Sequence, residues 1–360
     1  MTLETKKSTV AEKMLALKAA GPVRALTKTQ LDSRLRDISL TTLYADAVFE
    51  GGGVKGLAFV GAIQVAEHLG VQWKSVAGTS AGAITACLLG AGYAADELER
   101  TLMDLDFNEF MDEGLLDRIP LIGKIASAIF EKGIYEGDYF ERWMARMLGE
   151  KNIATFGQLK ENDGNARRNY RLKLIASDVT RKQMVVVPDG LHEYGRDPDG
   201  FPIARAARMS MSIPYFFEPV VMDYAVPGEG RTTKVNIVDG GLLSNFPVWL
   251  FDAASGQAPR WPTFGFKLIE PDSDVVDQAK WPHEYVMALV NTMLEAHDKA
   301  YISQANFERT IAVPTMGIHT TQFDLTKDDK NLLLRAGQEA AIHFFETWDF
   351  ERHNIDHDRI

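Results

Sequence analysis

Three short glycine-containing motifs hold the residues of this 360-residue chain that could do chemistry. The first motif, residues 78–82, reads Gly-Thr-Ser-Ala-Gly and places Ser80 between Gly78 and Gly82. A serine at a sharp strand-to-helix turn projects its hydroxyl above the sheet, and it needs very small neighbours so that the backbone can turn so tightly. Apolar segments on both sides of the motif predict a strand before the turn and a helix after it, whose N-terminal dipole would be directed at the site. We therefore interpret Ser80 as a nucleophile rather than as part of a structural turn.

The second motif is the glycine run Gly51-Gly52-Gly53, which follows a predicted strand and begins a predicted helix. Its bare N–H groups could converge on a phosphate or on the oxyanion of a tetrahedral intermediate. The P-loop spacing is absent, but together with Gly56 the run formally matches the G-x-G-x-x-G pattern of dinucleotide-binding proteins. That pattern also requires an acidic residue about 20 residues further on. None is present there, so acyl chemistry is favoured. Lys55 could help to hold an anionic lipid headgroup, or it could be a solvated side chain.

The third motif is Asp239-Gly240-Gly241, directly after the apolar residues 235–238. An aspartate at the C-terminal end of a parallel strand points into the usual binding crevice of such sheets, although an Asp-Gly pair is also common in plain turns. An exposed aspartate with a pKa of about 3.9 is a poor base at neutral pH, but burial would raise that pKa. Together with the other two motifs, we interpret this aspartate as functional rather than as part of a plain turn.

In this order, the three motifs resemble the motif blocks of the patatin-like phospholipases, over residues 45–350 of the chain. Ser177-Asp178 and the Arg-x-Ser-x-Ser pattern of residues 208–212 resemble intervening elements of the same family. The resemblance implies a lipid acyl hydrolase with a Ser–Asp dyad. In such a dyad the carboxyl takes the serine proton and returns it to the leaving alcohol, and the scheme requires no metal and no cofactor. Its implied site residues are Ser80 as nucleophile, Asp239 as base, the Gly51, Gly52 and Gly53 amides as oxyanion hole, and Lys55, Gly56, Gly78, Gly82, Gly240 and Gly241 as supporting residues. The family pattern often begins with aspartate where this chain has Glu50, and we expect that change to be tolerated because the anion-binding donors are backbone groups.

Other catalytic plans use residues that the three motifs do not contain. A Ser-His-Asp triad would need a histidine after the acid, and His297, His319 and His343 are the candidates by position, followed by His353 and His357 in a charged tail. We expect each of them to be a surface or structural residue. An acyltransferase or thioesterase using the same serine is the main alternative to a hydrolase, and a non-enzymatic nucleotide-binding module is the third reading.

The elements that must position these residues alternate between strand and helix patterns, which predicts an α/β fold. We expect a mainly parallel central sheet flanked by helices on both faces, in a patatin-like three-layer architecture. Strands are predicted at residues 45–49, 73–77, 171–176, 183–187, 235–238, 264–269 and 310–313, and helices at 10–20, 30–38, 54–69, 83–89, 137–148, 284–308 and 327–347. The predicted organisation is a helical arm at residues 1–44, a catalytic domain at 45–350 and a charged tail at 351–360.

Composition narrows the classes of partner and compartment. The net charge of −11 argues against nucleic-acid binding, and the single cysteine, Cys87, excludes a disulfide framework. The polar N-terminus is not typical of a secretory signal peptide, and no segment has the apolar length of a membrane span. We therefore expect a cytoplasmic protein that contacts lipid only peripherally. Residues 119–130 are a candidate lid and Phe216-Phe217 a candidate wall of an acyl pocket, each with ordinary core packing as the alternative. The oligomeric state is not predicted.

Overall fold

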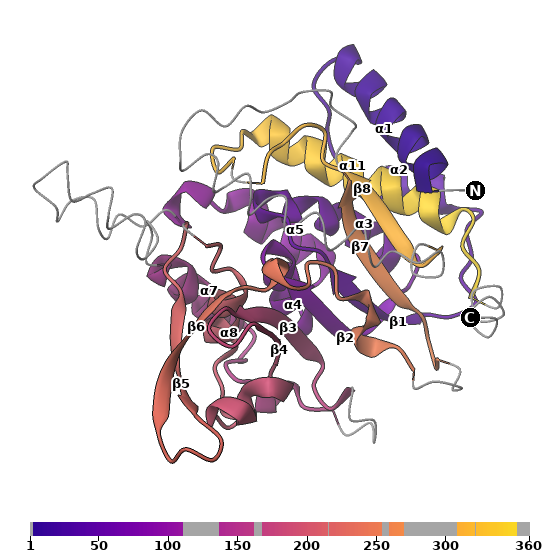
Figure 1. Cartoon of the computed structure of the whole chain (residues 1–360). Helices are drawn as coiled ribbons and strands as arrows, with labels where there is room; N and C mark the ends of the chain where they lie inside the picture. The colour runs from indigo at the N-terminus through magenta and orange to yellow at the C-terminus, as the bar shows by residue number, and fades with distance from the viewer. Residues whose placement is uncertain are drawn as a thin grey trace, which may run out of the picture.

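A single mixed sheet organises the part of the chain that the computed structural model describes, which is residues 3–110, 137–161, 168–214, 216–253, 259–269, 308–320 and 322–350. Its strand order is β5-β6-β3-β2-β1-β7-β8, with β4 paired to β3. The strands are β1 (Tyr44–Phe49), β2 (Gln72–Thr79), β3 (Leu172–Asp178), β4 (Gln183–Val187), β5 (Val220–Ala225), β6 (Thr232–Asp239), β7 (Thr263–Ile269) and β8 (Thr310–Pro314). Figure 1 shows the sheet running from β5 and β6 at the lower left to β7 and β8 at the upper right.

The centre of the sheet is parallel and one end of it is antiparallel. The β1–β2, β1–β7, β2–β3 and β7–β8 pairs are parallel, whereas β3–β4, β3–β6 and β5–β6 are antiparallel. The crossover helices that parallel neighbours require follow β1, after a short 3-10 turn, and β2, after a single residue. The prediction of an α/β fold with a mainly parallel central sheet and helices around it is confirmed.

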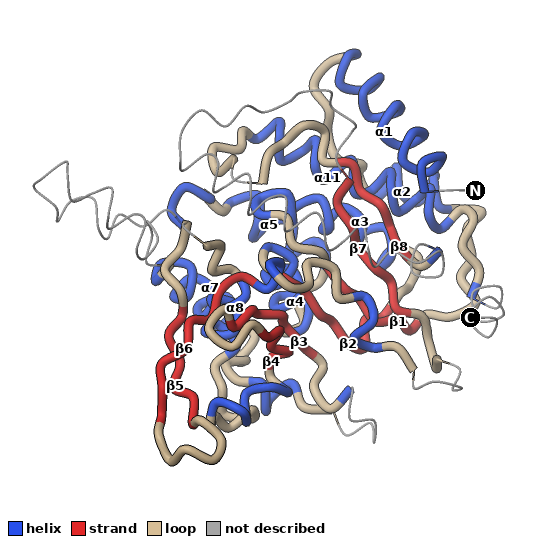
Figure 2. Tube along the Cα trace, in the orientation of Figure 1, coloured by secondary structure: helices blue, strands red, loops and turns tan. Residues whose placement is uncertain are grey.

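Helices of very different length surround the sheet (Figure 2). The α-helices are α1 (Leu3–Ala20), α2 (Lys28–Leu35), α3 (Leu57–His68), α4 (Ala81–Gly90), α5 (Ala95–Asp104), α7 (Asp138–Glu150), α8 (Ile203–Ser210) and α11 (Lys327–Phe345). Short 3-10 helices lie at η1 (Gly53–Gly56), η2 (Phe107–Phe110), η4 (Phe156–Leu159), η6 (Asp189–Tyr194), η7 (Gly240–Leu242) and η8 (Val248–Phe251). The glycine run therefore enters α3 through one tight turn rather than directly.

Alternate residues of the central strands supply two apolar layers, as the pleat of a strand requires. Phe49, Val76 and Leu174 are fully buried in the large core that also contains α3, α4 and α11. Their neighbours in sequence face the other way, into a small cluster where Val48, Ala77 and Ile175 meet Leu250 and Phe251 of η8. Among the described residues, a 3-10 helix thus covers the second face at the centre of the sheet.

The N-terminal helices are attached to α11 by a buried carboxylate. Glu339 on α11 is only 2% exposed, and it forms ion pairs with Lys13 of α1, with Arg34 of α2 and with Arg335 of its own helix. One buried anion with three cationic partners avoids the high cost of an unpaired buried charge. This cluster holds α1 and α2 against the main body.

The predicted elements differ from the observed ones in a few places. Strand β5 and helices α5 and α8 were not predicted, although α8 contacts the end of the strand that carries Ser80. The predicted helix at residues 284–308 lies outside the described residues except for its last position, and the candidate lid at 119–130 lies wholly outside them. Phe217 is 2% exposed and Phe216 stacks on Phe323 with ring centroids 5.1 Å apart, so both residues pack in or against the core.

Candidate active site

The sheet itself brings the ends of β2 and β6 together along one edge of β3. Residues 174–175 of β3 pair with both β4 and β2, and residues 176–178 pair with both β4 and β6. Because β4 occupies one edge of β3 throughout, β2 and β6 must share the other edge. Thr79 lies opposite Ile175, and Asp239 lies opposite the next residue, Ala176. Ser80 and Asp239, far apart in sequence, therefore meet where the two strands end.

Ser80 occupies a strained turn between β2 and α4. Its φ of 53° and ψ of −125° are unusual for a residue with a side chain. The turn is compact because Gly82 lies against the end of β1, where an added Cβ would be 2.4 Å from the carbonyl oxygen of Phe49. Gly78 is equally confined, since its Cβ would be 2.2 Å from the carbonyl oxygen of Gly82. The two glycines of this motif are thus required by close backbone contacts.

Asp239 is a buried carboxyl whose described hydrogen-bond partner is a backbone amide. It is 1% exposed, and its Oδ1 accepts a hydrogen bond of 2.8 Å from the amide of Gly241. Burial raises the pKa of Asp239 to about 7, while the Ser80 hydroxyl and the Gly241 amide favour the charged form and limit the rise. The Oδ2 atom is buried and has no closely formed hydrogen bond to the described residues. The Ser80 hydroxyl thus lies close enough to the carboxyl of Asp239 to act on its pKa.

The glycine run lies beside Ser80, but its three amides differ. The amide of Gly51 donates to the carbonyl oxygen of Asn245 at 3.1 Å. The expectation that all three amides are available to an anion therefore does not hold for Gly51. The amides of Gly52 and Gly53 donate to no acceptor within the described part of the chain. These two remain candidates for binding an anion.

Tight packing explains the other features of the same loop. Gly53 has a φ of 57°, and an added Cβ would lie 1.9 Å from the carbonyl oxygen of Thr320. Gly56 is less confined, since the nearest atom to its Cβ would be 3.5 Å away. Lys55 is 5% exposed and passes close to Gly52, which contradicts the reading of a solvated lysine.

Three further predicted residues, Gly240, Ser177 and Asp178, lie at the ends of β6 and β3. An added Cβ on Gly240 would lie 2.2 Å from the carbonyl oxygen of Ile175, and the Ser177 hydroxyl donates to the carbonyl oxygen of Gly240 at 3.3 Å. Asp178 instead accepts hydrogen bonds from the amides of the turn that follows β3. Ser177 therefore supports the motif of Asp239, whereas Asp178 has a local structural role.

Two groups near the site were not predicted as functional residues. Asn245 forms two hydrogen bonds with Gly51. Its backbone carbonyl accepts from the Gly51 amide, and its side-chain Nδ2 donates to the Gly51 carbonyl at 3.3 Å. Glu50, directly before the glycines, accepts from the Lys267 ammonium and from the Leu268 amide. No sequence signal identified Asn245. Glu50 was noted only because the family pattern often has aspartate there, and we expected the change to be tolerated because the anion-binding donors are backbone groups. Both residues attach the glycine run to neighbouring elements.

No histidine is brought to the site in the part of the chain that the structure describes. The His343 ring faces Glu346 at 3.8 Å, His319 is exposed, and neither has a described contact with Ser80 or Asp239. His297, His353 and His357 lie outside the described residues. The described residues also contain no group of three side chains suited to hold a metal ion, and no helix among them is long and apolar enough to cross a membrane.

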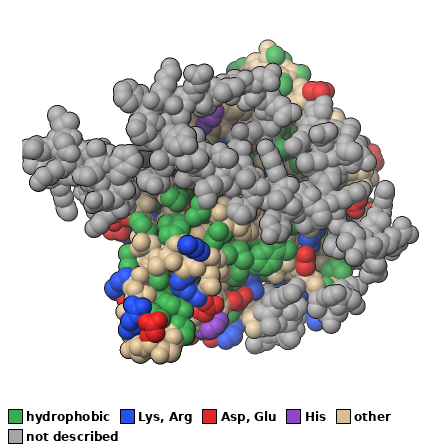
Figure 3. All heavy atoms as spheres, viewed as in Figure 1, with side chains coloured by type: hydrophobic (Ala, Val, Ile, Leu, Met, Phe, Trp, Pro, Cys, Tyr) green, Lys and Arg blue, Asp and Glu red, His purple; other side chains and the backbone are tan. Residues whose placement is uncertain are grey.

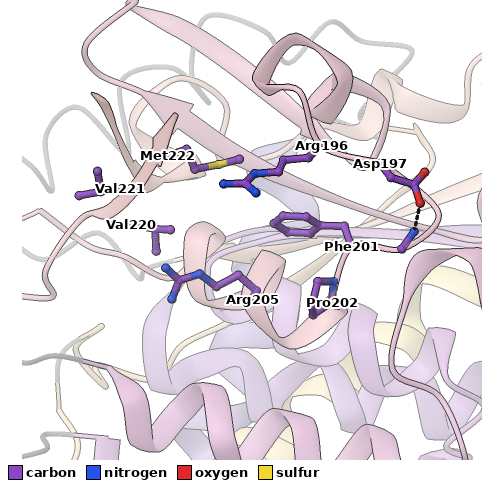
Figure 4. A pocket seen from close by; sticks show the side chains of 9 residues that line it. Arg196, Asp197, Phe201, Pro202, Arg205, Val220, Val221 and Met222 are labelled. Carbon is purple, nitrogen blue, oxygen red and sulfur yellow. Dashed lines mark hydrogen bonds between the residues drawn. The ribbon is translucent and has the colours of Figure 1, made fainter. Parts of the chain in front are cut away.

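A cavity of about 370 Å³ lies elsewhere, between β5, the start of α8 and the loop that precedes it (Figure 4). Arg196 and Arg205 enter it from opposite walls. Arg205 pairs with Glu141 at 2.8 Å, and Arg196 lies 3.9 Å from Asp223. The charge of both arginines is balanced, so the cavity has no marked preference for an anion, and it contains none of the predicted site residues.

Comparison with known proteins identifies the family of this chain. The model of the family described as patatin-like phospholipase matches residues 47–252, a range that includes Ser80, Asp239 and the glycine run. The chain belongs to the patatin-like phospholipase family. Membership assigns this patatin-like chain, at the level of the family, to the lipid acyl hydrolases, and it confirms the resemblance seen in the sequence.

The relatives of this patatin-like chain include proteins of similar length. It is 37% identical over 310 residues to the uncharacterized protein YqhO of Bacillus subtilis, covering 86% of this chain and 100% of YqhO. It is 25% identical over 304 residues to the uncharacterized protein R571 of Acanthamoeba polyphaga mimivirus, covering 81% of this chain and 90% of R571. Among solved structures, VipD from Legionella pneumophila is similar with a TM-score of 0.49 and 17% identity, covering 86% of this chain and 70% of VipD.

Proposed function

We propose that the protein is a serine hydrolase that cleaves carboxylic esters of phospholipids or lysophospholipids through Ser80 and Asp239. The observation that carries the proposal is a buried carboxyl with a pKa near 7 that faces a serine hydroxyl on a strained strand-to-helix turn. A base with a pKa close to the working pH combines a useful ionised fraction with enough affinity for a proton. Burial thus gives Asp239 the basicity for which other hydrolases use a histidine.

The reaction proceeds in two half-reactions. Ionised Asp239 takes the proton of the Ser80 hydroxyl while the oxygen attacks the ester carbonyl, and a tetrahedral oxyanion forms. The amides of Gly52 and Gly53, with the N-terminal end of α4, stabilise that oxyanion. Protonated Asp239 then donates its proton to the leaving alcohol, and an acyl ester remains on Ser80. Asp239 then takes a proton from water as the water attacks this ester, and it returns the proton to the Ser80 oxygen as the acyl–oxygen bond breaks and the fatty acid leaves.

Lipid reaches the site through peripheral contact in this proposal. Hydrophobic side chains gather below the middle of the face shown in Figure 3, with charged side chains around them. Trp249, in η8 and four residues beyond Asn245, is 39% exposed. An exposed indole is suited to the boundary between water and acyl chains. The net charge of −11 gives no attraction to anionic bilayers, so apolar contact has to provide the affinity.

Replacement of the nucleophile tests the proposal. Purified protein is assayed with a panel of phospholipids, lysophospholipids and short-chain nitrophenyl esters, and Ser80→Ala is expected to abolish turnover of every substrate that the native chain cleaves. Ser75→Ala, a buried serine earlier in the same strand, is the matched control and should retain activity. A fluorophosphonate probe should modify the peptide that contains Ser80. Retained hydrolysis in Ser80→Ala would refute the proposal, and acyl transfer to an added alcohol or thiol in place of free fatty acid would indicate the acyltransferase or thioesterase alternative.

A further inference from the structure

One short segment holds both reacting residues of the proposed mechanism. The amide of Ser80 donates to the Oγ of Ser210 at 3.1 Å, and the amide of Asp239 donates to the carbonyl oxygen of Ser212 at 2.8 Å. Ser210 is the last residue of α8, and both serines are 0% exposed. The segment at residues 210–212, which we call the serine bridge, therefore lies between the end of β2 and the end of β6.

The strained conformation of Ser80 makes the first of these contacts important. A non-glycine residue with φ near 53° persists only when its surroundings determine it, because such strain costs about 1–3 kcal/mol. The carbonyl oxygen of Ser80 accepts a hydrogen bond of 2.8 Å from the amide of Ala83 in the first turn of α4. Ser210 binds the other side of the same residue. The peptide groups on both sides of the Ser80 side chain are thus fixed, and Ser210 provides the only side-chain acceptor for the Ser80 amide among the described residues.

Arg208 locks the serine bridge in place. Its guanidinium donates to the Ser212 hydroxyl and, at 2.8 Å, to the carbonyl oxygen of Glu218, and it lies 5.2 Å from the centre of the Phe217 ring. The Ser212 hydroxyl in turn donates to the carbonyl oxygen of Arg208 at 2.7 Å. Arg208 is 3% exposed, so these contacts form away from water. The bridge is therefore rigid, and its position is set by α8 rather than by the two strands that it joins.

We infer that Ser210 is a positioning residue of the active site, which acts through the Ser80 amide to direct the Ser80 hydroxyl towards Asp239. The inference rests on the proposed function, since it assigns a role to Ser210 only if Ser80 is the nucleophile. Ser210 takes no proton and touches no reacting atom. Its Oγ accepts one hydrogen bond from the Ser80 backbone and thereby limits rotation of the turn on which the nucleophile stands.

The test is Ser210→Ala in the full chain, with rates expressed per active site titrated by a fluorophosphonate. Loss of positioning alone is expected to lower kcat about 10- to 100-fold, because small errors in the placement of reacting groups are expensive in rate. KM should stay within about twofold, since no substrate contact is removed. A purely structural role would reduce the number of titrated sites and leave kcat per site unchanged. Thr85→Val is the matched control, because Thr85 is a buried hydroxyl residue of α4 whose Oγ1 has no partner among the described residues.

Parallel measurements keep the inference separate from the proposed function. If Ser80→Ala is active, the proposed function fails. If Ser80→Ala is inactive and Ser210→Ala has the native kcat per site, only the role of Ser210 is overturned. Should Ser210→Ala not fold, Ser210→Cys keeps the shape of the side chain with a slightly larger atom that is a weaker acceptor, and it is expected to turn over more slowly per site than the native chain. An equal rate in Ser210→Cys would then overturn the inference.

Discussion

Asp239→Asn should make the protein inactive and, at alkaline pH, more stable. In the folded chain, burial raises the pKa of Asp239 to about 7 from its ordinary value of 3.8. Between these two pH values the folded state holds a proton that the unfolded state has released, so the free energy of unfolding falls as the pH rises. The difference of roughly three pKa units, at about 1.4 kcal/mol per unit, amounts to about 4 kcal/mol at pH 8.

The asparagine variant is free of this penalty because its side chain is neutral at every pH. Its Oδ1 can still accept the hydrogen bond from Gly241, so the local backbone should be retained. Relative to the native chain, Asp239→Asn should therefore gain up to about 4 kcal/mol at pH 8, and about 3 kcal/mol of that gain should develop between pH 5 and pH 8. Urea unfolding of both proteins at several pH values, followed by tryptophan fluorescence, measures the difference directly.

The kinetic part of the same prediction concerns the ionised fraction of the base. The kcat/KM of the native chain should fall tenfold per pH unit below about pH 7, and Asp239→Asn should lose at least about 100-fold in turnover at every pH. Asp223→Asn is the control, because Lys234 lowers the pKa of the half-buried Asp223 and no gain that grows with pH is expected there. A stability difference that is independent of pH, or a native rate profile that stays flat down to pH 5, would refute the reasoning about burial.

Three further substitutions test how the site is supported. Gly53→Ala should abolish activity and lower the thermal midpoint, because its Cβ would lie 1.9 Å from a backbone oxygen. Gly56→Ala should fold and keep most of its activity, because the nearest atom to its Cβ would be 3.5 Å away. Equal behaviour of the two variants would contradict the packing argument. Glu50→Gln should lower the free energy of unfolding by about 3 kcal/mol, because Lys267 would lose the carboxylate beside it. Urea titration measures this loss, and an unchanged midpoint would show that the ion pair is dispensable. Glu339→Gln should speed proteolysis of the first 40 residues without altering ester hydrolysis, and unchanged cleavage would mean that other contacts hold α1 and α2.

Local patterns were sufficient to predict the elements that carry the motifs. A short apolar run, a glycine turn and a helix with apolar residues on one side occur twice in succession, and both units form at the expected places as β1–α3 and β2–α4. Strand β5 was missed because its apolar residues do not alternate with polar ones: Val221 is 51% exposed, although it lies between Val220 and Met222, which are buried in the large core. Helix α8 was missed because it has only eight residues, which include Arg205 and Arg208 and end in Ser210, so that few apolar positions are left to show a helical period.

Contacts between distant residues could not be derived from the sequence. Ser210 is 130 residues from Ser80, and nothing in the local pattern of either segment shows that a hydroxyl accepts from that amide. The same holds for Asn245, whose carbonyl removes Gly51 from the set of available donors. Motif spacing therefore predicts which residue types are present, whereas the assignment of each backbone donor depends on how the strands pair.

In the proposed mechanism, the electrostatics of the base Asp239 are separate from the contacts that position it. A raised pKa requires that Asp239 be surrounded by neutral groups, and burial and two neutral donors account for its pKa. A cation would orient the carboxyl firmly but would also lower its pKa and weaken it as a base. Backbone amides avoid this conflict, because the hydrogen bond from Asp239 to Ser212 and that from Ser80 to Ser210 involve no titrating atom. The cation that rigidifies the arrangement, Arg208, acts on the serine bridge and does not contribute to the pKa shift of Asp239. A dyad without histidine can thus be both basic and well positioned when neighbouring backbone, here the serine bridge, holds it in place. We therefore expect changes in the serine bridge to affect kcat and not the pH profile.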